Sequence, residues 1–294
     1  MGGVDGNNND LSSVESLNPS SNVQCQNMKD MPTNRYNYIS NNHWICGGFE
    51  GGSYSKSCWF MNDKYEWEIS SMTLPYTLTD APSIMVNNHE WWITGGNHYH
   101  DDGEPISNTI LIDIHQQTVT SHFHLPEIMS YHCMAKINQS TVLIAGNAPC
   151  MNCRSDGKSS YLVDISSKPF QFGQRKSLME QRWGAGCGVL PSFGGKSQVM
   201  IVVGGANSAA RQTTEVFDEE LNQWKPGPRL LRGFYCGGFL SNPLILIGGW
   251  VENDITKKDI MWYNPLNETF QYLPGELKTA RAFFNVISVN KDAC

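Results

Sequence analysis

The segment "NHYHDDGEP" (97–105) gathers residue types that bind metal ions, two histidines followed by two aspartates. Imidazole and carboxylate groups coordinate zinc only where their spacing places them around one point. Here His98, His100, Asp101 and Asp102 are nearly adjacent on a turn-like loop. We therefore expect a solvated polar loop without a metal ion. His98 and His100 remain candidates for contact with a partner.

A second candidate for metal or redox chemistry is the pair Cys150–Cys153 in "CMNC". Zinc sites of this kind need a second pair, and none follows, so a loop disulfide or two thiols fit better. The sequence also contains no glycine-rich phosphate loop, no G-x-S-x-G elbow and no carboxylate pair at a convincing spacing. We expect no catalytic residues and no cofactor.

The overall charge narrows the classes of partner. The 294 residues carry a formal net charge of −7 and contain no run of Lys or Arg. Nucleic acid is an unfavourable partner, because neutralising phosphates requires clustered positive charge. No stretch approaches the roughly 18 consecutive apolar residues of a membrane span, so none is predicted.

These side chains must be positioned by a repeat. "NNHWICGGFEGG" (41–52) is echoed by "NNHEWWITGG" (87–96). The glycines that recur in this pattern are Gly2, Gly3, Gly47, Gly48, Gly95, Gly96, Gly146, Gly204, Gly205, Gly248 and Gly249. One copy is weaker, because it reads Ala145-Gly146, and there we assign Gly146 as the second glycine of the pair. A period of about 45 to 60 residues is typical of propellers and solenoids.

Other features recur in phase with the glycines. A short β-rich run precedes most pairs, as at 91–94, and an apolar segment ending in Asp or Asn follows, as at 112–113. A further residue, usually bulky, stands a few positions later: Trp67, Val119, Phe170, Trp224, Phe270 and, in the first copy, Cys25. Each unit therefore reads as four short strands, and six such units describe a β-propeller.

Gly-Gly, then Tyr/Phe-Asp/Asn, then Trp/Phe resembles the kelch repeat over nearly the whole chain. The resemblance implies an all-β, six-bladed kelch-type β-propeller, a monomer, whose incomplete closing blade takes strands from both termini. The predicted units are approximately 1–32, 33–78, 79–128, 129–179, 180–229 and 230–276, with a closing strand at 280–290. Because the first unit lacks its first strand and most of its second, we expect the sequence to be truncated upstream of Met1. A three-stranded closing blade is the alternative.

The resemblance also implies a function, recognition of a protein or peptide through the loops between the second and third strands. Arg35, Arg182, Arg232 and Arg281 begin the first strands of their units. They either grip an acidic peptide, as in some kelch adaptors, or satisfy nearby backbone carbonyls and acids. The contexts left open are a ubiquitin-ligase substrate adaptor or actin-associated scaffold and a secreted extracellular protein. A propeller enzyme acting on a sugar or an alcohol is a further alternative.

Cysteines and sequons bear on the compartment. Cys46 ends one strand and Cys58 begins its antiparallel neighbour, so these two are candidates for a disulfide, which would indicate an oxidising compartment. Cys133, Cys187 and Cys236 share a place near the start of the first strand, where we expect packing. Sequons at Asn138 and Asn267 fall on turns opposite the predicted binding loops. Cytoplasmic and secreted locations both remain open.

Overall fold

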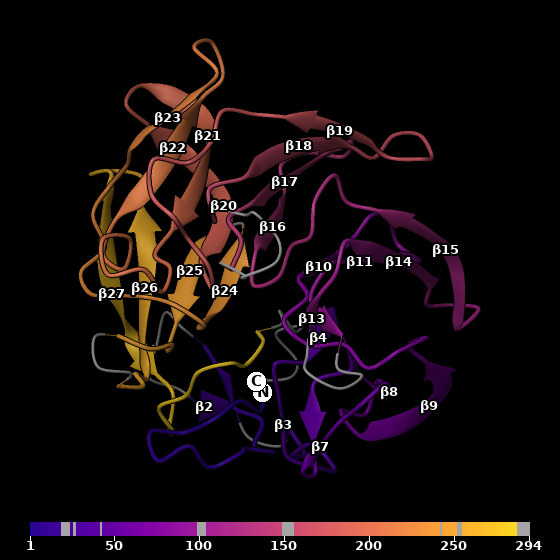
Figure 1. The fold of residues 1–294 in the computed structure, drawn as a ribbon. Helices are drawn as coiled ribbons and strands as arrows, with labels where there is room; N and C mark the ends of the chain where they lie inside the picture. The colour runs from indigo at the N-terminus through magenta and orange to yellow at the C-terminus, as the bar shows by residue number, and fades with distance from the viewer. Residues whose placement is uncertain are drawn as a thin grey trace. The chain divides into compact units, whose positions relative to one another are not determined.

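The computed structural model describes residues 1–18, 24–25, 28–41, 43–98, 104–148, 156–241, 243–251 and 255–286. Over these residues the protein is all-β and consists of antiparallel sheets, five of which have four strands (Figure 1). The chain divides into two compact units: unit 1 comprises residues 1–130 with the segment from 274 onward, and unit 2 comprises 131–273. The described part of the chain holds no helix long and apolar enough to cross a membrane.

Unit 1 contains two four-stranded sheets. Their strands, in spatial order, are β4 (Ile39–Asn41), β5 (Trp44–Cys46), β8 (Ser57–Met61) and β9 (Trp67–Thr73), then β10 (Ser83–Met85), β11 (Glu90–Thr94), β14 (Asn108–Asp113) and β15 (Thr118–His124). Short pairings complete the unit: β1 (Ser16–Leu17) with β2 (Gln24–Cys25), β3 (Arg35–Tyr36) with β6 (Phe49–Glu50) and β7 (Ser53–Tyr54), and β12 (Asn97–His98) with β13 (Glu104–Pro105).

Unit 2 contains three four-stranded sheets. The strands are β16 (Cys133–Lys136), β17 (Thr141–Ala145), β18 (Ser160–Asp164) and β19 (Gln171–Gln174); β20 (Gly186–Phe193), β21 (Lys196–Val203), β22 (Thr214–Asp218) and β23 (Gln223–Pro226); and β24 (Gly238–Ser241), β25 (Leu244–Ile247), β26 (Asp259–Asn264) and β27 (Thr269–Glu276), which runs past the end of the unit. Every four-stranded sheet falls inside one of the predicted repeats, and its strands are ordered as in the sequence.

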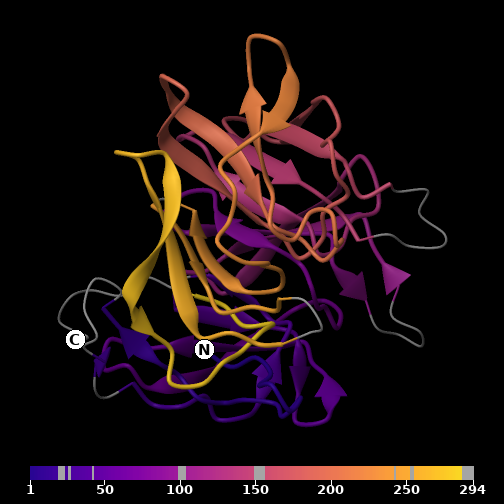
Figure 2. The same cartoon turned by 90° about the vertical axis from the view of Figure 1, so that its left-hand side faces the viewer.

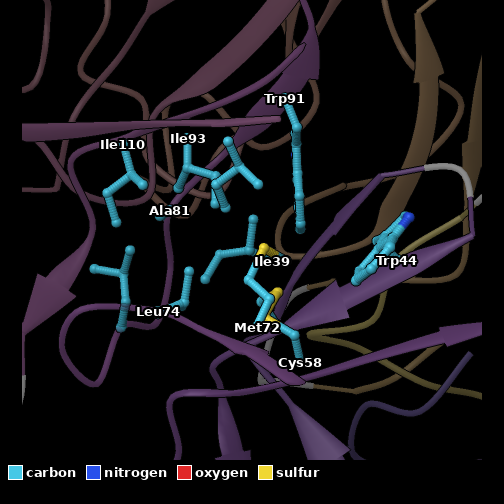
Figure 3. Packing of buried hydrophobic residues seen from close by; sticks show 12 residues of the cluster. Ile39, Trp44, Cys58, Met72, Leu74, Ala81, Trp91, Ile93 and Ile110 are labelled. Carbon is cyan, nitrogen blue, oxygen red and sulfur yellow. A yellow bond between two sulfur atoms is a disulfide. The ribbon is translucent and has the colours of Figure 1, made fainter. Parts of the chain in front are cut away.

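The core of each unit lies between neighbouring sheets. In unit 1, Ile39 and Leu74 of the first sheet region face Ile93 and Ile110 of the second (Figure 3). In unit 2, Trp224 packs into a cluster with residues of β16 and β17, and its indole N–H donates to the Ser160 hydroxyl at 3.1 Å. Sheets stacked in this way bury apolar side chains on both faces, which explains why the second strands are short continuous apolar runs.

The repeat glycines fix where each second strand turns into its loop. The first glycine of each repeat donates its N–H to the carbonyl at the start of the third strand: Gly2 to Ser13, Gly47 to Ser57, Gly95 to Asn108, Gly146 to Ser159, Gly204 to Thr213 and Gly248 to Asp259. Gly146 therefore occupies the first position and Asn147 the second, so the assignment of Gly146 as a second glycine was wrong. At Gly96, φ is +93° and a Cβ would lie 2.5 Å from the Thr79 carbonyl oxygen, which excludes other residues.

Residues 274–286 lie beside the N-terminal residues in unit 1 (Figures 1 and 2). Val4 pairs with Ala282 in an isolated antiparallel bridge, as Thr79 pairs with Asn97 elsewhere in the unit. Of the predicted closing strand at 280–290, residues 280–286 form this bridge but no extended strand, and 287–290 lie outside the described residues.

Candidate binding surface at the loop end of unit 2

Each four-stranded sheet has two distinct ends. At the end called here the loop end, the first strand begins, the second ends, the third begins and the fourth ends. At the opposite end, called the turn end, lie the connections between the first and second strands and between the third and fourth. The loops predicted to bind a partner belong to the loop end.

Four aromatic side chains form a continuous row at the loop end of unit 2. Ring centroids are separated by 5.4 Å between Tyr131 and Trp183, by 6.4 Å between Trp183 and Tyr235, and by 5.4 Å between Tyr235 and Trp250. All three contacts are edge-to-face, a favourable geometry for aromatic pairs. Tyr235 is buried, and the other three rings are half-buried. This aromatic row is partly open to solvent.

The backbone explains why these rings meet. Tyr131, Trp183 and Tyr235 each stand two or three residues before the first strand of a sheet, and Trp250 follows the pair Gly248–Gly249. An antiparallel bridge between Tyr235 and Trp250 brings the two sides together. Trp183 and Tyr235 occupy the same position in neighbouring sheets, three residues before the first strand, whereas Tyr131 stands one position closer to its strand, where the next two sheets have Gly184 and Cys236.

A cation completes the row. The Arg211 guanidinium carbon lies 4.9 Å from the centroid of the Tyr235 ring, within cation–π distance. Its Nε donates to the Ala206 carbonyl at 3.0 Å. Its terminal nitrogens make no hydrogen bond to another described residue, and the side chain is half-buried. Arg211 can therefore donate two parallel hydrogen bonds to a ligand carboxylate.

Together these residues suit a ligand with a carboxylate beside an apolar or aromatic group. Trp, Tyr and Arg are the residue types that dominate binding energy at protein interfaces. The loops between second and third strands, which the sequence predicts to bind a partner, contribute Arg211 and Trp250 to this surface. Tyr131, Trp183 and Tyr235 were not predicted. Their signal in the sequence is an aromatic residue just before three consecutive first strands.

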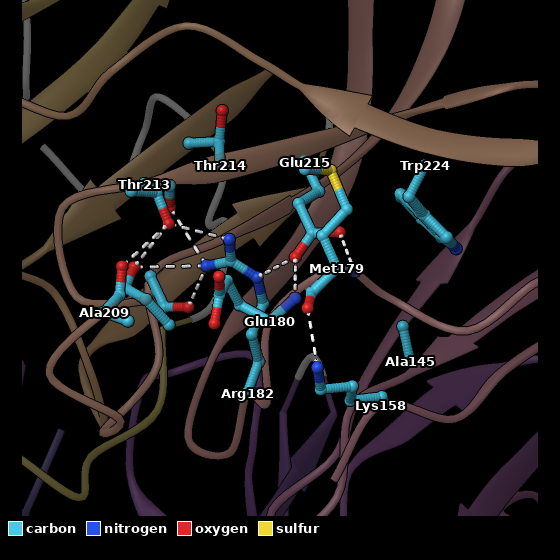
Figure 4. A network of polar contacts seen from close by, with 12 residues as sticks. Ala145, Lys158, Met179, Glu180, Arg182, Ala209, Thr213, Thr214, Glu215 and Trp224 are labelled. Atoms are coloured by element: carbon cyan, nitrogen blue, oxygen red, sulfur yellow. Dashed lines mark hydrogen bonds and ion pairs between the residues drawn. The ribbon is translucent and has the colours of Figure 1, made fainter.

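The arginines predicted to bind an acidic peptide lie elsewhere. Arg35, Arg182 and Arg281 are at most 1% exposed. Each guanidinium donates to the carbonyl of the first glycine of its sheet, Gly47, Gly204 and Gly2 respectively, and to the carbonyl and hydroxyl of Ser57, Thr213 and Ser13. Each also pairs with a carboxylate, Glu50, Glu215 and Glu15. Figure 4 shows this network around Arg182.

Arg232 reaches a similar set of partners from another position. It donates to the Gly248 carbonyl at 2.9 Å and pairs with Asp259. The backbone position that Arg182 occupies in its own repeat is taken here by Phe234, because Gly205 donates to the Phe234 carbonyl as Asn147 does to that of Arg182. The four arginines are thus not strictly equivalent. All four contact backbone carbonyls and acidic side chains of the protein itself, which was the alternative to binding an acidic peptide.

Glu50, the acid in the Arg35 network, is held ionised. Burial by itself would raise the pKa of Glu50, but hydrogen bonds from Arg35, Ser55, Ser57 and Thr33 outweigh that effect and lower the pKa to about 2. The charge of each buried arginine is therefore compensated inside the fold, and it stabilises the junction between a glycine pair and its third strand.

The histidine segment contributes no metal-binding group of three or more donors among the described residues. His98 is half-buried in unit 1, with its ring centroid 4.9 Å from that of Tyr76. The remaining candidates of that segment, His100, Asp101 and Asp102, and the pair Cys150–Cys153 lie outside the described residues.

Two disulfides are present among the residues that the structure describes. Cys46 and Cys58 are directly opposed in the register of β5 and β8, as the sequence suggested, and their sulfur atoms are bonded. A second disulfide joins Cys133 of β16 to Cys187 of β20, with a Cα–Cα distance of 5.6 Å. The expectation of simple packing was therefore wrong for these two residues, which link neighbouring sheets. Cys236 is buried.

The two sequons lie on exposed turns at the turn end. Asn138 is in the connection between β16 and β17, and Asn267 is in the connection between β26 and β27. In both, the Asn Oδ1 accepts a hydrogen bond from the hydroxyl two residues later, Ser140 at 3.2 Å and Thr269 at 2.7 Å.

Comparison with known proteins identifies a similar fold but no family. No family model matches the sequence, and no curated protein sequence matches it. Among solved structures, that of YjhT is similar with a TM-score of 0.70 and 11% sequence identity, covering 90% of this chain and 97% of that chain. At this identity the likeness concerns the fold alone.

Proposed function

We propose that this protein is a non-enzymatic, six-bladed kelch-type β-propeller that binds a protein or peptide through its loop end. The observation that carries the proposal is the aromatic row of unit 2 with Arg211 stacked on Tyr235. Large rigid rings bind at a low cost in conformational entropy, and a partly open guanidinium adds a directional contact. The ligand is a segment with an Asp or Glu beside an apolar or aromatic residue.

The six-bladed assignment is supported by contacts that the N-terminal glycine pair shares with a complete repeat. Arg281 contacts Gly2, Ser13 and Glu15 as Arg35 contacts Gly47, Ser57 and Glu50. Residues near 281 therefore take the place of a first strand for the N-terminal glycine pair. In this proposal the sixth blade closes a monomeric ring with segments from both ends of the chain.

The disulfides favour the extracellular context over the adaptor and scaffold contexts. Disulfides persist in oxidising compartments and are rare where glutathione keeps thiols reduced. One of them, Cys133–Cys187, links two sheets with a separation of 54 residues. We therefore place this protein among secreted interaction proteins.

The test is selection of random phage-displayed peptides on the immobilised full chain. We expect the recovered peptides to pair an acidic with an apolar residue, and Trp183→Ala to weaken their binding by roughly 30-fold or more. Lys196→Ala is the matched control, because Lys196 lies at the turn end in the β20–β21 hairpin and is half exposed. Equal losses in both variants, or no specific peptide, would overturn the proposal.

A further inference from the structure

Unit 2 has a groove of about 730 Å³ between the β16–β19 sheet and strands β21 and β22 of the next sheet. Its floor is apolar and comprises Ile137, Leu162, Phe172, Met200 and Phe217. Met200 and Phe217 are buried members of the core, whereas the other three are half-buried. Apolar side chains beside the core of unit 2 are thus partly exposed to solvent along this groove.

The rim is polar, and several of its groups carry both donors and acceptors. Gln171, Asn222, Glu219 and Arg175 line it. An aromatic ring on the floor with amides and charged groups around it suits a sugar, which has an apolar face and a fringe of hydroxyl groups.

Asn138 lines the same groove and begins the sequon Asn138-Gln139-Ser140. The turn holds it firmly: its Oδ1 accepts hydrogen bonds from the Ser140 backbone N–H at 2.9 Å and from the Ser140 hydroxyl at 3.2 Å. Both bonds use Oδ1, which leaves Nδ2, the atom that bears an N-linked glycan, for attachment. Asn138 is exposed.

We propose that Asn138 carries an N-linked oligosaccharide and that its first sugars occupy this groove, over Phe172. The attachment consumes a lipid-pyrophosphate-linked oligosaccharide in the secretory pathway. The Asn138 Nδ2–C1 bond forms as the bond from C1 to the pyrophosphate oxygen breaks, the lipid pyrophosphate leaves, and Nδ2 loses one proton. Nothing is oxidised or reduced.

The inference rests on the secretory compartment proposed above but not on peptide binding. The groove reaches the turn end, where Asn138 lies, whereas the aromatic row lies at the loop end. A glycan at Asn138 therefore leaves the proposed binding surface open. The two proposals can fail separately. Ser140→Ala removes the sequon but is expected to keep the affinity for the selected peptides, so a missing glycan would leave the proposed peptide binding intact.

The second sequon supplies an internal control. Asn267 is also exposed and hydrogen bonded within its turn, but it is not among the residues that line the groove. A sugar attached there would not lie in this groove. Ser140→Ala and Thr269→Ala each abolish one sequon and leave the asparagine in place.

The experiment is to secrete the full chain from cultured eukaryotic cells and measure glycan occupancy at each asparagine by mass spectrometry of its peptides. Thermal unfolding and binding of an apolar fluorescent dye are then compared for the wild type, Ser140→Ala and Thr269→Ala. We expect Asn138 to be occupied. Loss of its glycan should lower the melting temperature and raise dye binding by about twofold or more, with little change for Thr269→Ala.

Because Ser140→Ala also removes a hydrogen bond, the same variants are made in the bacterial periplasm, where this eukaryotic-type glycan is absent. There we expect Ser140→Ala and wild type to bind the dye equally. An unoccupied Asn138 in the secreted protein overturns the proposal. So does an occupied Asn138 whose loss changes neither dye binding nor the melting temperature more than loss at Asn267 does.

Discussion

Replacing Arg182 by Met tests whether the buried arginines hold the fold together. Arg182 is fully buried, and its guanidinium donates to the carbonyls of Gly204 at 2.6 Å and of Ala210 and Thr213 at 3.1 Å. It also pairs with Glu215, which is 2% exposed, at 2.9 Å (Figure 4). Methionine keeps the aliphatic volume but leaves a buried carboxylate without its partner charge. Breaking such a pair costs about 3–5 kcal/mol.

That loss is a large part of the roughly 5–15 kcal/mol by which domains are stable. With a urea slope of about 3 kcal/mol per molar, the unfolding midpoint should fall by about 1–1.5 M. Arg175→Met is the control, since the guanidinium of this half-buried arginine makes only one hydrogen bond among those described, at 3.4 Å to the Gln174 carbonyl. We expect it to cost less than about 1 kcal/mol. Equal midpoints for Arg182→Met and wild type would refute the structural role.

Three further predictions concern the backbone, the disulfides and pH. Gly204→Ala should lower the free energy of unfolding at least twice as much as Gly194→Ala. Both glycines have positive φ, so Ala costs about 1–2 kcal/mol of backbone strain at either position, but only at Gly204 would the new Cβ also meet the Phe234 carbonyl, because nothing lies near a Cβ at Gly194. Similar denaturation midpoints for the two variants would contradict this. Replacing Cys133 and Cys187 together by Ser should lower the free energy of unfolding by about 4 kcal/mol, as expected for a 54-residue separation. The bridge would be excluded if thiol titration of the wild type, unfolded without reductant, finds both cysteines reduced. Burial lowers the pKa of His132 to about 3, so between about pH 6.5 and 3 the unfolded state binds a proton that the folded state does not. The free energy of unfolding should therefore fall as the pH drops through that window, by about 2 kcal/mol at pH 5. If calorimetry gives His132→Gln the same dependence of stability on pH as the wild type, this prediction is contradicted.

The strand order was predictable because its determinants are local. A glycine with positive φ between an apolar run and a loop marks the end of each second strand, and this signal survives where the rest of the repeat diverges. It failed at Ala145-Gly146, where sequence alone cannot show which of two backbone positions the single glycine fills. The hydrogen bonds of Gly146 and Asn147 decide that question.

The partners of charged and sulfur-bearing side chains were less predictable. Four arginines near the starts of their repeats fit either a binding role or a buried one. The two roles are separated only by the burial of the side chains and by their contacts with backbone carbonyls and carboxylates, which the sequence does not show. Likewise, Cys133 and Cys187 lie 54 residues apart. They pair because the first strands of two successive sheets lie side by side, and the sequence alone does not show how close those strands come. The aromatic row has the same origin, because its rings come from separate repeats.

The loop end of unit 2 is proposed to bind a carboxylate-bearing peptide through Arg211 and the aromatic row. The dissociation constant of one selected peptide, measured by calorimetry for wild type, Arg211→Ala and Lys196→Ala, tests this proposal. We expect roughly tenfold or greater weakening for Arg211→Ala and no change for Lys196→Ala. We also expect a smaller difference in affinity between wild type and Arg211→Ala when the acidic residue of the peptide is replaced by its amide. Unchanged affinity for Arg211→Ala would contradict it.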